Sequence, residues 1–413
     1  MSDSPTDAQR THRLVKLAWL ATGIYLLALG ISAVLREQGD FNVYYRAGTR
    51  VLHGEAIYRL DEGSHFLYAP IFAIMFAPFA ALPLRAAKLA WYLVCAASLL
   101  GLIFGSRRML FGGAGRSSPA LLVIPLILCS PFINNNIDHG QINLPTLALV
   151  VWSIVFAEED RAVVSGGALA AAILVKPFAG LAALFLLLEG KWRPIVYSLV
   201  FGILLLIAPI AVFGPSGALA DTTSYLKVVS SMTDRYTMML TNQSATSAIA
   251  RLMSLGGPSD APPSHLALYI GTAIEAAFVA AVIIWFVSDR EPRPLMGKPH
   301  RFELAALFCI MPSLVPISWK SYYAALLVPY MLLTLVLWTD RPPDSRTPAL
   351  TLALIAISAI LNWIPGRRAN HIALFFSAHF LSSVVLMAAV ATAATWWRHA
   401  GACRLTPSRT VNN

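Results

Sequence analysis

The sequence predicts an all-α, polytopic membrane protein, and three observations carry this prediction. The chain of 413 residues is 57% hydrophobic and only 13% charged, whereas roughly 25% of the residues are charged in a typical soluble domain. Apolar runs of about 20 residues, the length at which a helix spans a bilayer, recur from one end of the chain to the other. The alternating segments of about ten residues that mark a membrane β-barrel do not occur in the sequence.

The apolar runs give the expected membrane helices. They cover residues 14–35, 86–105, 119–133, 142–157, 162–188, 194–213, 266–288, 302–317, 322–338, 348–365 and 372–396. A further apolar segment, 66–83, is interrupted by three prolines, Pro70, Pro78 and Pro83. Because each proline removes a helix hydrogen-bond donor, this segment is predicted to be interfacial or re-entrant and not to cross the membrane.

The Lys and Arg residues predict the orientation. The basic stretches are the N-terminal segment, the 107–116 loop, Arg161, Lys191 with Arg193, the 290–301 loop, Arg341 with Arg346 and the C-terminal tail. They fall on one side if 66–83 does not cross and if 162–188 crosses twice, turning at Lys176-Pro177. The positive-inside rule then places both termini in the cytoplasm, with about twelve spans in the cell (inner) membrane.

One membrane domain covering 1–413 is expected, with two large loops on the non-cytoplasmic face. The first covers 36–85 and contains juxtamembrane elements, and the second covers 214–265. The shorter loops 134–141, 318–321 and 366–371 share this face. The net charge of +10 comes from basic residues scattered through short loops, so membrane orientation explains it and no nucleic-acid partner is expected. The positions of the four cysteines indicate no disulfide framework.

Three polar features gather on the non-cytoplasmic face. They are Asp40 with Tyr44, Tyr45 and Arg46, the run from Asn134 to Asn143 that contains His139 and Gln141, and Lys176 inside an apolar double pass. An ionisable residue within a membrane segment is costly, so it indicates a functional site. Structural alternatives exist for each feature. Asp40 could cap a helix, the asparagine-rich run could be a solvated turn, and Lys176 could extend its ammonium to the interface.

Short motifs follow one another along nearly the whole chain. They are Gly39-Asp40-Phe41-x-Val43-Tyr44-Tyr45-x-Ala47, Gly54-x-x-x-Tyr58, Tyr68-x-Pro70, Pro78-x-x-x-Leu82-Pro83 with Trp91, Gly140-Gln141-x-Asn143, Gly166-Gly167 with Lys176-Pro177, Lys191-Trp192-Arg193, Asn242-Gln243-Ser244 and Pro316-Ile317-Ser318-Trp319-x-x-Tyr322-Tyr323. This ordered set resembles glycosyltransferase family 87. The chain departs from the family pattern at Lys320 and Ser321, where the pattern often has Asp and usually has His.

The resemblance implies the GT-C fold and the transfer of a sugar, typically mannose, from a polyprenyl-phosphate donor to an acceptor hydroxyl outside the cytoplasm. It implies Asp40 as the catalytic base, a role that suits a carboxylate on a positioned loop. Lys176 is the first candidate for binding the donor phosphate, and Arg46, Arg235 and Lys320 are weaker candidates. The candidates for hydrogen bonds to sugar or phosphate are Tyr44, Tyr45, His139, Gln141, Asn143, Asn242, Gln243 and Tyr322. No metal or other cofactor is expected.

The polar residues favour an inverting transfer. Asp40 is the one strong candidate carboxylate in the sequence, and a phosphate leaving group needs no proton from the enzyme, in contrast to a two-carboxylate hydrolase. The acceptor is expected to be a glycolipid or a glycan, and arabinofuranose remains an alternative to mannose. The other classes considered are a scaffold and a transporter or flippase for lipid-linked sugars or small solutes. A transporter of the inverted-repeat type would show internal symmetry and polar residues at the membrane midplane, and the sequence shows neither.

Overall fold

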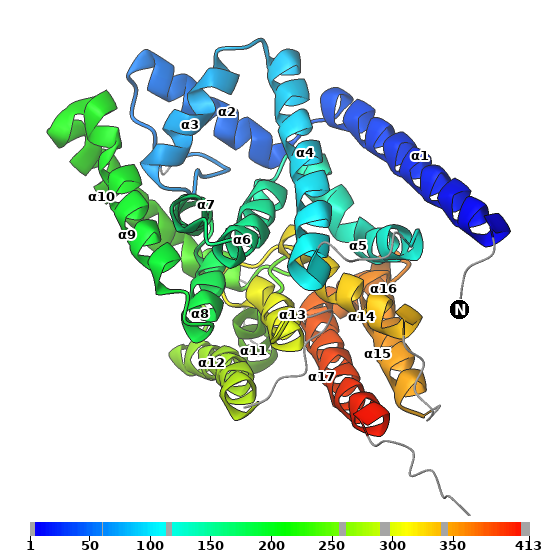
Figure 1. The fold of residues 1–413 in the computed structure, drawn as a ribbon. Coiled ribbons are helices and arrows are strands. Elements are labelled where there is room, and N and C mark those ends of the chain that lie inside the picture. The colour runs from blue at the N-terminus through cyan, green and yellow to red at the C-terminus, as the bar shows by residue number, and fades with distance from the viewer. Residues whose placement is uncertain are drawn as a thin grey trace, which may run out of the picture.

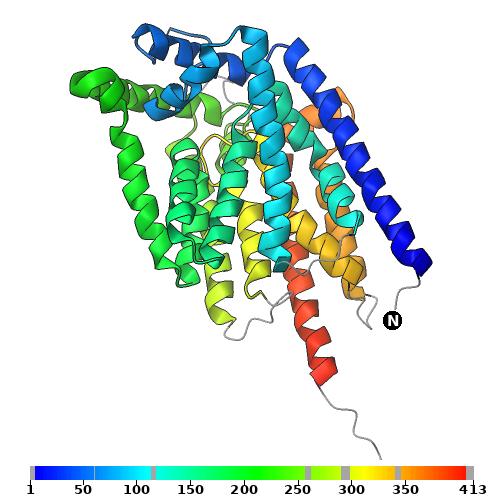
Figure 2. The same ribbon diagram turned by 45° about the horizontal axis from the view of Figure 1, so that its top comes forward.

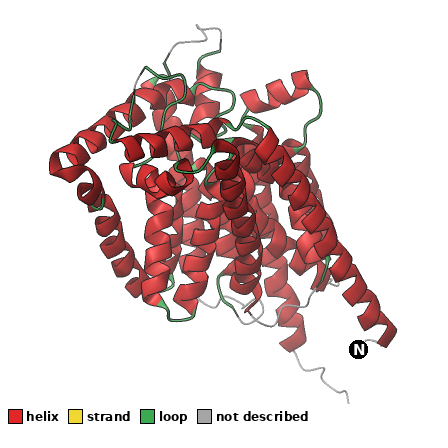
Figure 3. Ribbon diagram, turned by 90° about the horizontal axis from the view of Figure 1, so that it is seen from above, coloured by secondary structure: helices red, strands yellow, loops and turns green. Residues whose placement is uncertain are grey.

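The computed structural model describes residues 5–59, 61–112, 118–255, 262–289, 298–339 and 346–405. Within these residues the chain is helical, without a β-strand, and one isolated bridge pairs Asn242 with Trp319 (Figure 3). Long helices run side by side through the molecule, and shorter helices lie across one end of this bundle (Figure 2). The all-α prediction is therefore confirmed.

The helices follow one another along the chain as labelled in Figure 1. The first half contains α1 (Pro5–Leu35), α2 (Gly39–His53), α3 (Pro70–Ala80), α4 (Leu84–Phe111), α5 (Ala120–His139), α6 (Asn143–Glu158), α7 (Ala162–Val175), the 3-10 turn η2 (Pro177–Ala179), α8 (Gly180–Leu188) and α9 (Trp192–Ile207). The second half contains α10 (Pro209–Thr237), α11 (Ala245–Met253), α12 (His265–Ser288), α13 (Arg301–Ile310), η3 (Met311–Ser313), η4 (Lys320–Leu326), α14 (Leu327–Thr339), α15 (Arg346–Asn362), α16 (Arg367–Phe375) and α17 (Ala378–Leu405).

The described helices fit a polytopic membrane protein. By length and composition, six of them can cross a membrane, or up to eight spans form if each of two bent pairs counts as one. The bent pairs are α9 with the first part of α10, at 67°, and α15 with α16, at 110°. Pro70–Ala80, Asn143–Glu158, Ala162–Val175 and Pro177–Leu188 are shorter apolar helices. The membrane class is therefore confirmed, and the exact number of spans stays a prediction.

The segment 162–188 turns back on itself at Lys176, as the charge pattern predicts. Lys191 follows α8 and pairs with Asp160, which precedes α7, with 3.3 Å between Nζ and Oδ1. Both ends of the segment therefore lie at the same end of the bundle. The helix breaks at Lys176 because Pro177 has no N–H to donate and disfavours helical geometry in the residue before it.

The end of the bundle at Asp160 collects several basic stretches. The ion pairs here are Arg108–Glu159, with 2.7 Å between Nε and Oε1, Lys298–Glu158 and Arg301–Glu158. The first turn of α1 and the last turns of α17 lie at this end as well (Figure 2). The basic stretches that contain these described residues therefore share one end of the bundle. Arg116, Arg341 and the tail after residue 405 lie outside the described residues.

The opposite end is covered by α2, α3 and α10 (Figure 2). The eleven residues of α3 extend about 16 Å, roughly half the hydrocarbon thickness of a bilayer, which agrees with a segment 66–83 that does not cross. Gly48 of α2 lies against α3 so closely that a Cβ atom there would be 2.9 Å from the Cβ of Ala80. This close packing fixes α2, and therefore Asp40, to the rest of the molecule.

Several boundaries differ from the sequence prediction, three of them at breaks in a helix. The segment 302–317 is α-helical only to Ile310, since Pro312 interrupts the backbone hydrogen bonds after it. The segment 372–396 is divided by Ser377 (φ 51°) into the end of α16 and the span α17. The loop 214–265 begins inside the long helix α10, which bends at Gly214 (φ 71°) and lies across the bundle end, where Tyr225 meets Tyr58 with 5.9 Å between ring centroids.

Candidate active site

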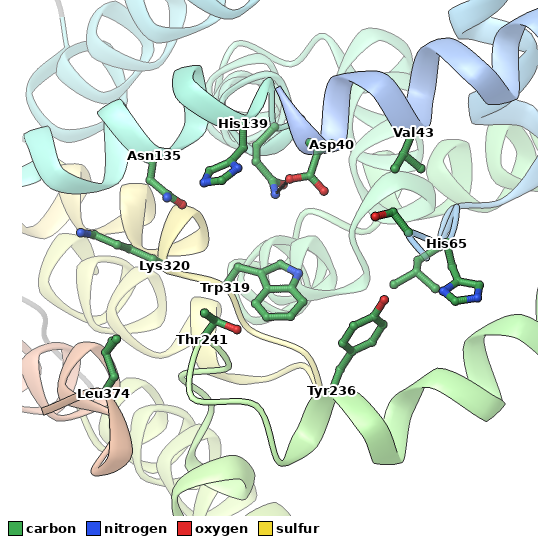
Figure 4. A pocket seen from close by; sticks show the side chains of 14 residues that line it. Asp40, Val43, His65, Asn135, His139, Tyr236, Thr241, Trp319, Lys320 and Leu374 are labelled. Carbon is green, nitrogen blue, oxygen red and sulfur yellow. Dashed lines mark hydrogen bonds between the residues drawn. The ribbon is translucent and has the colours of Figure 1, made fainter. Parts of the chain in front are cut away.

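Asp40 lies in the first turn of α2 and faces a cavity of ≈ 390 Å³ at the loop-covered end of the bundle (Figure 4). We call it the polar cavity. Its lining is Gly39, Asp40, Val43, Ser64, His65, Leu67, Asn135, His139, Gln141, Tyr236, Thr241, Trp319, Lys320 and Leu374. The N-cap of α2 is Gln38, while the Asp40 Oδ2 atom accepts a hydrogen bond from Gln141 Nε2 at 2.5 Å. The Asp40 carboxylate is therefore held by a different element and does not cap its own helix.

A chain of amides connects Asp40 to the segment that carries the departure from the family pattern. Asn143 Nδ2 donates to Gln141 Oε1 at 3.2 Å and to Ser321 Oγ at 2.9 Å. Asn143 and Ser321 are fully buried, so these bonds are shielded from competing water. Ser321 thus contributes to the position of the Asp40 carboxylate through two intervening side chains.

The asparagine-rich run is not the predicted solvated turn, because α5 continues as a helix through His139. Its side chains point to three different partners. Asn134 accepts a hydrogen bond from α1, and Asn136 Nδ2 donates to the Ser321 carbonyl oxygen at 2.7 Å. Asn135 and His139, one helical turn apart, both line the polar cavity. Asn134 and Asn136 therefore make internal contacts of a packed helix, whereas Asn135 faces the polar cavity.

A second cavity, of ≈ 190 Å³, shares Asp40, Val43, His65, Leu67 and Trp319 with the polar cavity. We call it the apolar cavity. Its other lining residues are Tyr44, Tyr68, Leu174, Val175, Lys176, Pro177, Tyr225, Val229, Val315, Pro316, Ile317 and Tyr322. Aliphatic and aromatic side chains dominate this lining, and among the described residues Lys176 is the only Lys or Arg in it. Asp40 therefore lies in the lining shared by two cavities, one bordered mostly by residues with polar side chains and the other mostly by aliphatic and aromatic residues.

Lys176 is buried beside the apolar cavity. Its ammonium donates a hydrogen bond to the Tyr322 hydroxyl, and it lies 4.9 Å from the ring centroid of Tyr68 and 4.2 Å from that of Tyr322. Aromatic faces attract a cation, and these contacts hold the ammonium in place. Among the residues that the structure describes, Lys176 has no ion-pair partner within 4.0 Å.

The surroundings of Asp40 alter its acidity in opposite directions. Burial raises the pKa of the Asp40 carboxyl above its ordinary value, because the charged form loses its hydration. Electrostatic interactions with His139 and Lys176 and the hydrogen bond from Gln141 lower the pKa and offset part of this effect. Because the net pKa is raised, the carboxylate is a stronger base than one in water, which suits proton abstraction from a hydroxyl.

Three predicted site residues line neither cavity. The Tyr45 hydroxyl donates to the Leu82 carbonyl oxygen at 2.9 Å. Arg46 donates to the Ser64 carbonyl oxygen at 3.2 Å, so its contacts lie within the first loop. Arg235 is exposed on α10 and lines neither cavity.

Asn242 and Gln243, also predicted to bind substrate, are buried and bond to the backbone behind the cavities. Asn242 Nδ2 donates to the Pro316 carbonyl oxygen at 2.7 Å, and its Oδ1 accepts from the Ser318 amide at 2.9 Å. Gln243 Nε2 donates to the Leu374 carbonyl oxygen at 3.0 Å. These two side chains fix the segments that carry Trp319 and Leu374, so they shape the cavities without lining them.

The structure also adds residues that the sequence did not single out. His65, which lies in the first predicted loop and in none of the quoted motifs, is buried and lines both cavities. Trp319 lines both cavities and packs edge-on against Tyr236, with 5.6 Å between ring centroids. Trp319 lies inside a quoted motif, which was an available signal. No quoted motif contains His65, so only the folded loop reveals its position.

Fold and site define an integral membrane protein with a carboxylate and an ammonium facing joined cavities at one end of a helical bundle. The chain belongs to glycosyltransferase family 87, whose family model matches residues 66–298, and this confirms the resemblance seen in the sequence. The matched region contains Gln141, Asn143 and Lys176, whereas Asp40 precedes it and Lys320 follows it.

A curated relative matches most of the chain. The sequence is 28% identical over 389 residues to the polyprenol-phosphate-mannose-dependent alpha-(1-2)-phosphatidylinositol mannoside mannosyltransferase of Mycolicibacterium smegmatis. The alignment covers 88% of this chain and 82% of the relative. No solved structure matches the chain.

Proposed function

We propose that this glycosyltransferase transfers mannose, a hexose, from a polyprenyl-phosphate donor to a hydroxyl of a glycolipid or glycan acceptor. The transfer takes place on the non-cytoplasmic side and inverts the configuration at the sugar carbon. The observation that carries the proposal is that Asp40 and Lys176 line one apolar cavity. A base and a phosphate-binding cation are the two groups that this reaction needs. Family membership and the name of the relative support the same donor class.

Lys176 is assigned to the leaving group. The bond between the sugar carbon and the phosphate oxygen breaks with its electron pair on the phosphate, and a preplaced ammonium in a site of low dielectric stabilises that charge. The Tyr322 hydroxyl, already bonded to Lys176, is placed to contact the same phosphate. The aliphatic lining of the apolar cavity suits the first isoprene units of the lipid.

Asp40 is assigned to the acceptor. Its carboxylate takes the proton of the attacking hydroxyl while the new bond to the sugar carbon forms. Attack from the face opposite the phosphate inverts the configuration, so a donor linked β to phosphate gives an α-glycoside. The phosphate departs as an anion without needing a proton, and one carboxylate is sufficient for the chemistry.

Turnover of purified protein with a polyprenyl-phosphate mannose donor and a glycolipid acceptor tests the proposal. Asp40→Asn is expected to reduce the rate by about 10²- to 10⁴-fold, the usual contribution of a positioned base, without loss of folding or insertion. Asp160→Asn, a change at an exposed residue at the other end of the bundle, is the matched control and retains activity. Near-normal turnover by Asp40→Asn contradicts the proposal. Solute flux in liposomes without consumption of donor supports a transporter instead.

A further inference from the structure

The two lysines that were considered together for phosphate binding line different cavities. Lys176 lines the apolar cavity and Lys320 lines the polar cavity, and neither lysine lines both. Asp40 and Trp319 line both cavities. In Figure 4, Asn135, His139 and Lys320 lie at one end of the polar cavity, and Val43, His65 and Tyr236 lie at the other, with Asp40 between them. Val43 and His65 also line the apolar cavity, whereas Asn135, His139 and Lys320 do not.

The position of Lys320 is determined by its neighbours in the chain. Ser321, the next residue, is held at its carbonyl oxygen by Asn136 and at its hydroxyl by Asn143. On the other side, Trp319 takes part in the isolated bridge with Asn242. Lys320 therefore extends from a fixed backbone into the cavity.

The Lys320 end of the polar cavity carries positive charge and hydrogen-bond donors. Among the described residues, Lys320 has no ion-pair partner within 4.0 Å. In the part of the chain that the structure describes, Asp40 is the only carboxylate that lines this cavity, and His139 and Asn135 lie at the same end of it as Lys320. Leu374 brings α16 to the same cavity, and α16 begins with the exposed pair Arg367-Arg368. An anion is the ligand that such a set of groups binds best.

We propose that the polar cavity is the acceptor subsite and that Lys320 binds an anionic group carried by the acceptor. This inference rests on the proposed function, because inversion requires the acceptor hydroxyl to attack from the side of the sugar away from the phosphate. A donor phosphate at Lys176 and an acceptor in the polar cavity place Asp40 between the two substrates. The anionic group is either a phosphodiester of a lipid head group or a carboxylate of a glycan.

The inference also accounts for Arg367 and Arg368. These two residues are basic on the face that the positive-inside rule predicts to be poor in Lys and Arg. They begin the helix that reaches the acceptor subsite at Leu374. An anionic acceptor explains why this helix begins with two basic residues, because it would be attracted to them.

Lys320→Met and Lys176→Met, assayed side by side, test the inference. Three acceptors with the same sugar are compared, one with a phosphodiester, one with a carboxylate and one uncharged. Lys320→Met is expected to raise the acceptor KM by about 10- to 100-fold, the size of a lost hydrogen bond to a charged group, for one or both anionic acceptors. The KM of the uncharged acceptor and that of the donor stay unchanged. Lys176→Met instead raises the KM of the donor. Lys320→Arg restores the acceptor KM and shows that the loss is not a folding defect.

Two results overturn the inference. One is a rise in the donor KM of Lys320→Met, which places Lys320 on the donor phosphate. The other is an equal loss with charged and uncharged acceptors, which makes Lys320 structural. A binding measurement keeps this test separate from the proposed reaction. The affinity for the phosphodiester acceptor is measured without donor for two proteins, the Asp40→Asn variant and the double variant Asp40→Asn with Lys320→Met. If only the donor assignment is wrong, the second protein still binds this acceptor more weakly, provided that the anion is the phosphodiester. The carboxylate acceptor is tested in the same way.

Discussion

Among single residues, Gln141 has the most direct influence on Asp40. It donates to the carboxylate and in turn accepts from Asn143, which is bonded to Ser321. An amide at this position favours the charged form of the carboxyl, because its N–H forms a stronger hydrogen bond to a carboxylate oxygen than to a neutral carboxyl group. The position of the base and its acidity therefore depend on the same bond.

Replacing Gln141 with leucine is expected to move the acid limb of the pH profile of kcat/KM to higher pH. The base works as a carboxylate, so activity falls as the pH drops through the pKa of Asp40. Burial already raises this pKa, and the Gln141 bond lowers it in part, so removing the bond raises the pKa further. The rate at the pH optimum is expected to fall as well, since the carboxylate loses its positioning contact.

Initial rates across a series of buffers at constant ionic strength provide this measurement. Gln9→Leu, a change of the same type at an exposed residue of α1, serves as the control and keeps the wild-type profile. An acid limb that stays in place or moves to lower pH in Gln141→Leu contradicts the assigned link between Gln141 and the Asp40 carboxyl.

Among the elements, the two hairpin-like turns differ in how well the sequence predicts them. The turn at Lys176 was predictable, because Pro177 breaks the helix and the charge pattern requires two passes. The run after Ile133 was not predictable. Asparagine, aspartate and glycine are typical of turns, and here they continue α5 because their partners, α1 and η4, come from distant parts of the sequence.

The candidate site, too, could be predicted only in part, because contacts between distant parts of the sequence decide which side chains reach the cavities. Asp40, Gln141, Lys176, Tyr322, Tyr44, His139 and Lys320 could be selected from residue type and motif, and they do line the cavities. Asn242 and Gln243 were selected by the same reasoning and lie behind the cavities. A motif shows that a residue type matters at a position, but it does not separate a side chain that contacts a ligand from one that supports the backbone beside it.

Gly140, where α5 gives way to Gln141, is expected to tolerate no side chain. Its φ is +66°, a left-handed conformation, and an added Cβ would lie 2.6 Å from the Cβ of Phe41 in α2. Gly140→Ala is therefore expected to destabilise the protein by roughly 1–3 kcal/mol, from backbone strain and overpacking together. Because the displaced helix carries Asp40, activity is expected to fall more than stability alone explains.

Thermal unfolding in detergent and turnover at a temperature below the transition measure the two effects separately. Gly202→Ala in α9 is the matched control, since a Cβ there meets no atom within 4 Å, and it leaves both the unfolding temperature and turnover unchanged or slightly improves stability. Equal behaviour of the two variants refutes the close contact between Gly140 and α2.

In the whole molecule, the membrane orientation is predicted from the Lys and Arg residues, and the acidic residues that pair with some of them do not change this prediction. Glu158, Glu159 and Asp160 pair with Arg108, Lys191, Lys298 and Arg301 at one end of the bundle. The positive-inside rule counts Lys and Arg and gives little weight to Asp and Glu, so this end is expected to be cytoplasmic even though these four basic residues are paired with acids. The cavities at the other end then open toward the non-cytoplasmic side.

Cysteine labelling tests this orientation. In a Cys403→Ser background the other three cysteines are buried. Leu52→Cys on α2, where the leucine is 51% exposed, is expected to react with a membrane-impermeant maleimide on intact spheroplasts. Asp160→Cys, at a side chain that is 89% exposed, is expected to react only after the membrane is permeabilised. The opposite pattern would place Asp40 and the acceptor subsite on the cytoplasmic face, where they would meet cytoplasmic substrates. Arg367 and Arg368 would then follow the positive-inside rule, and no anionic ligand would be needed to explain them.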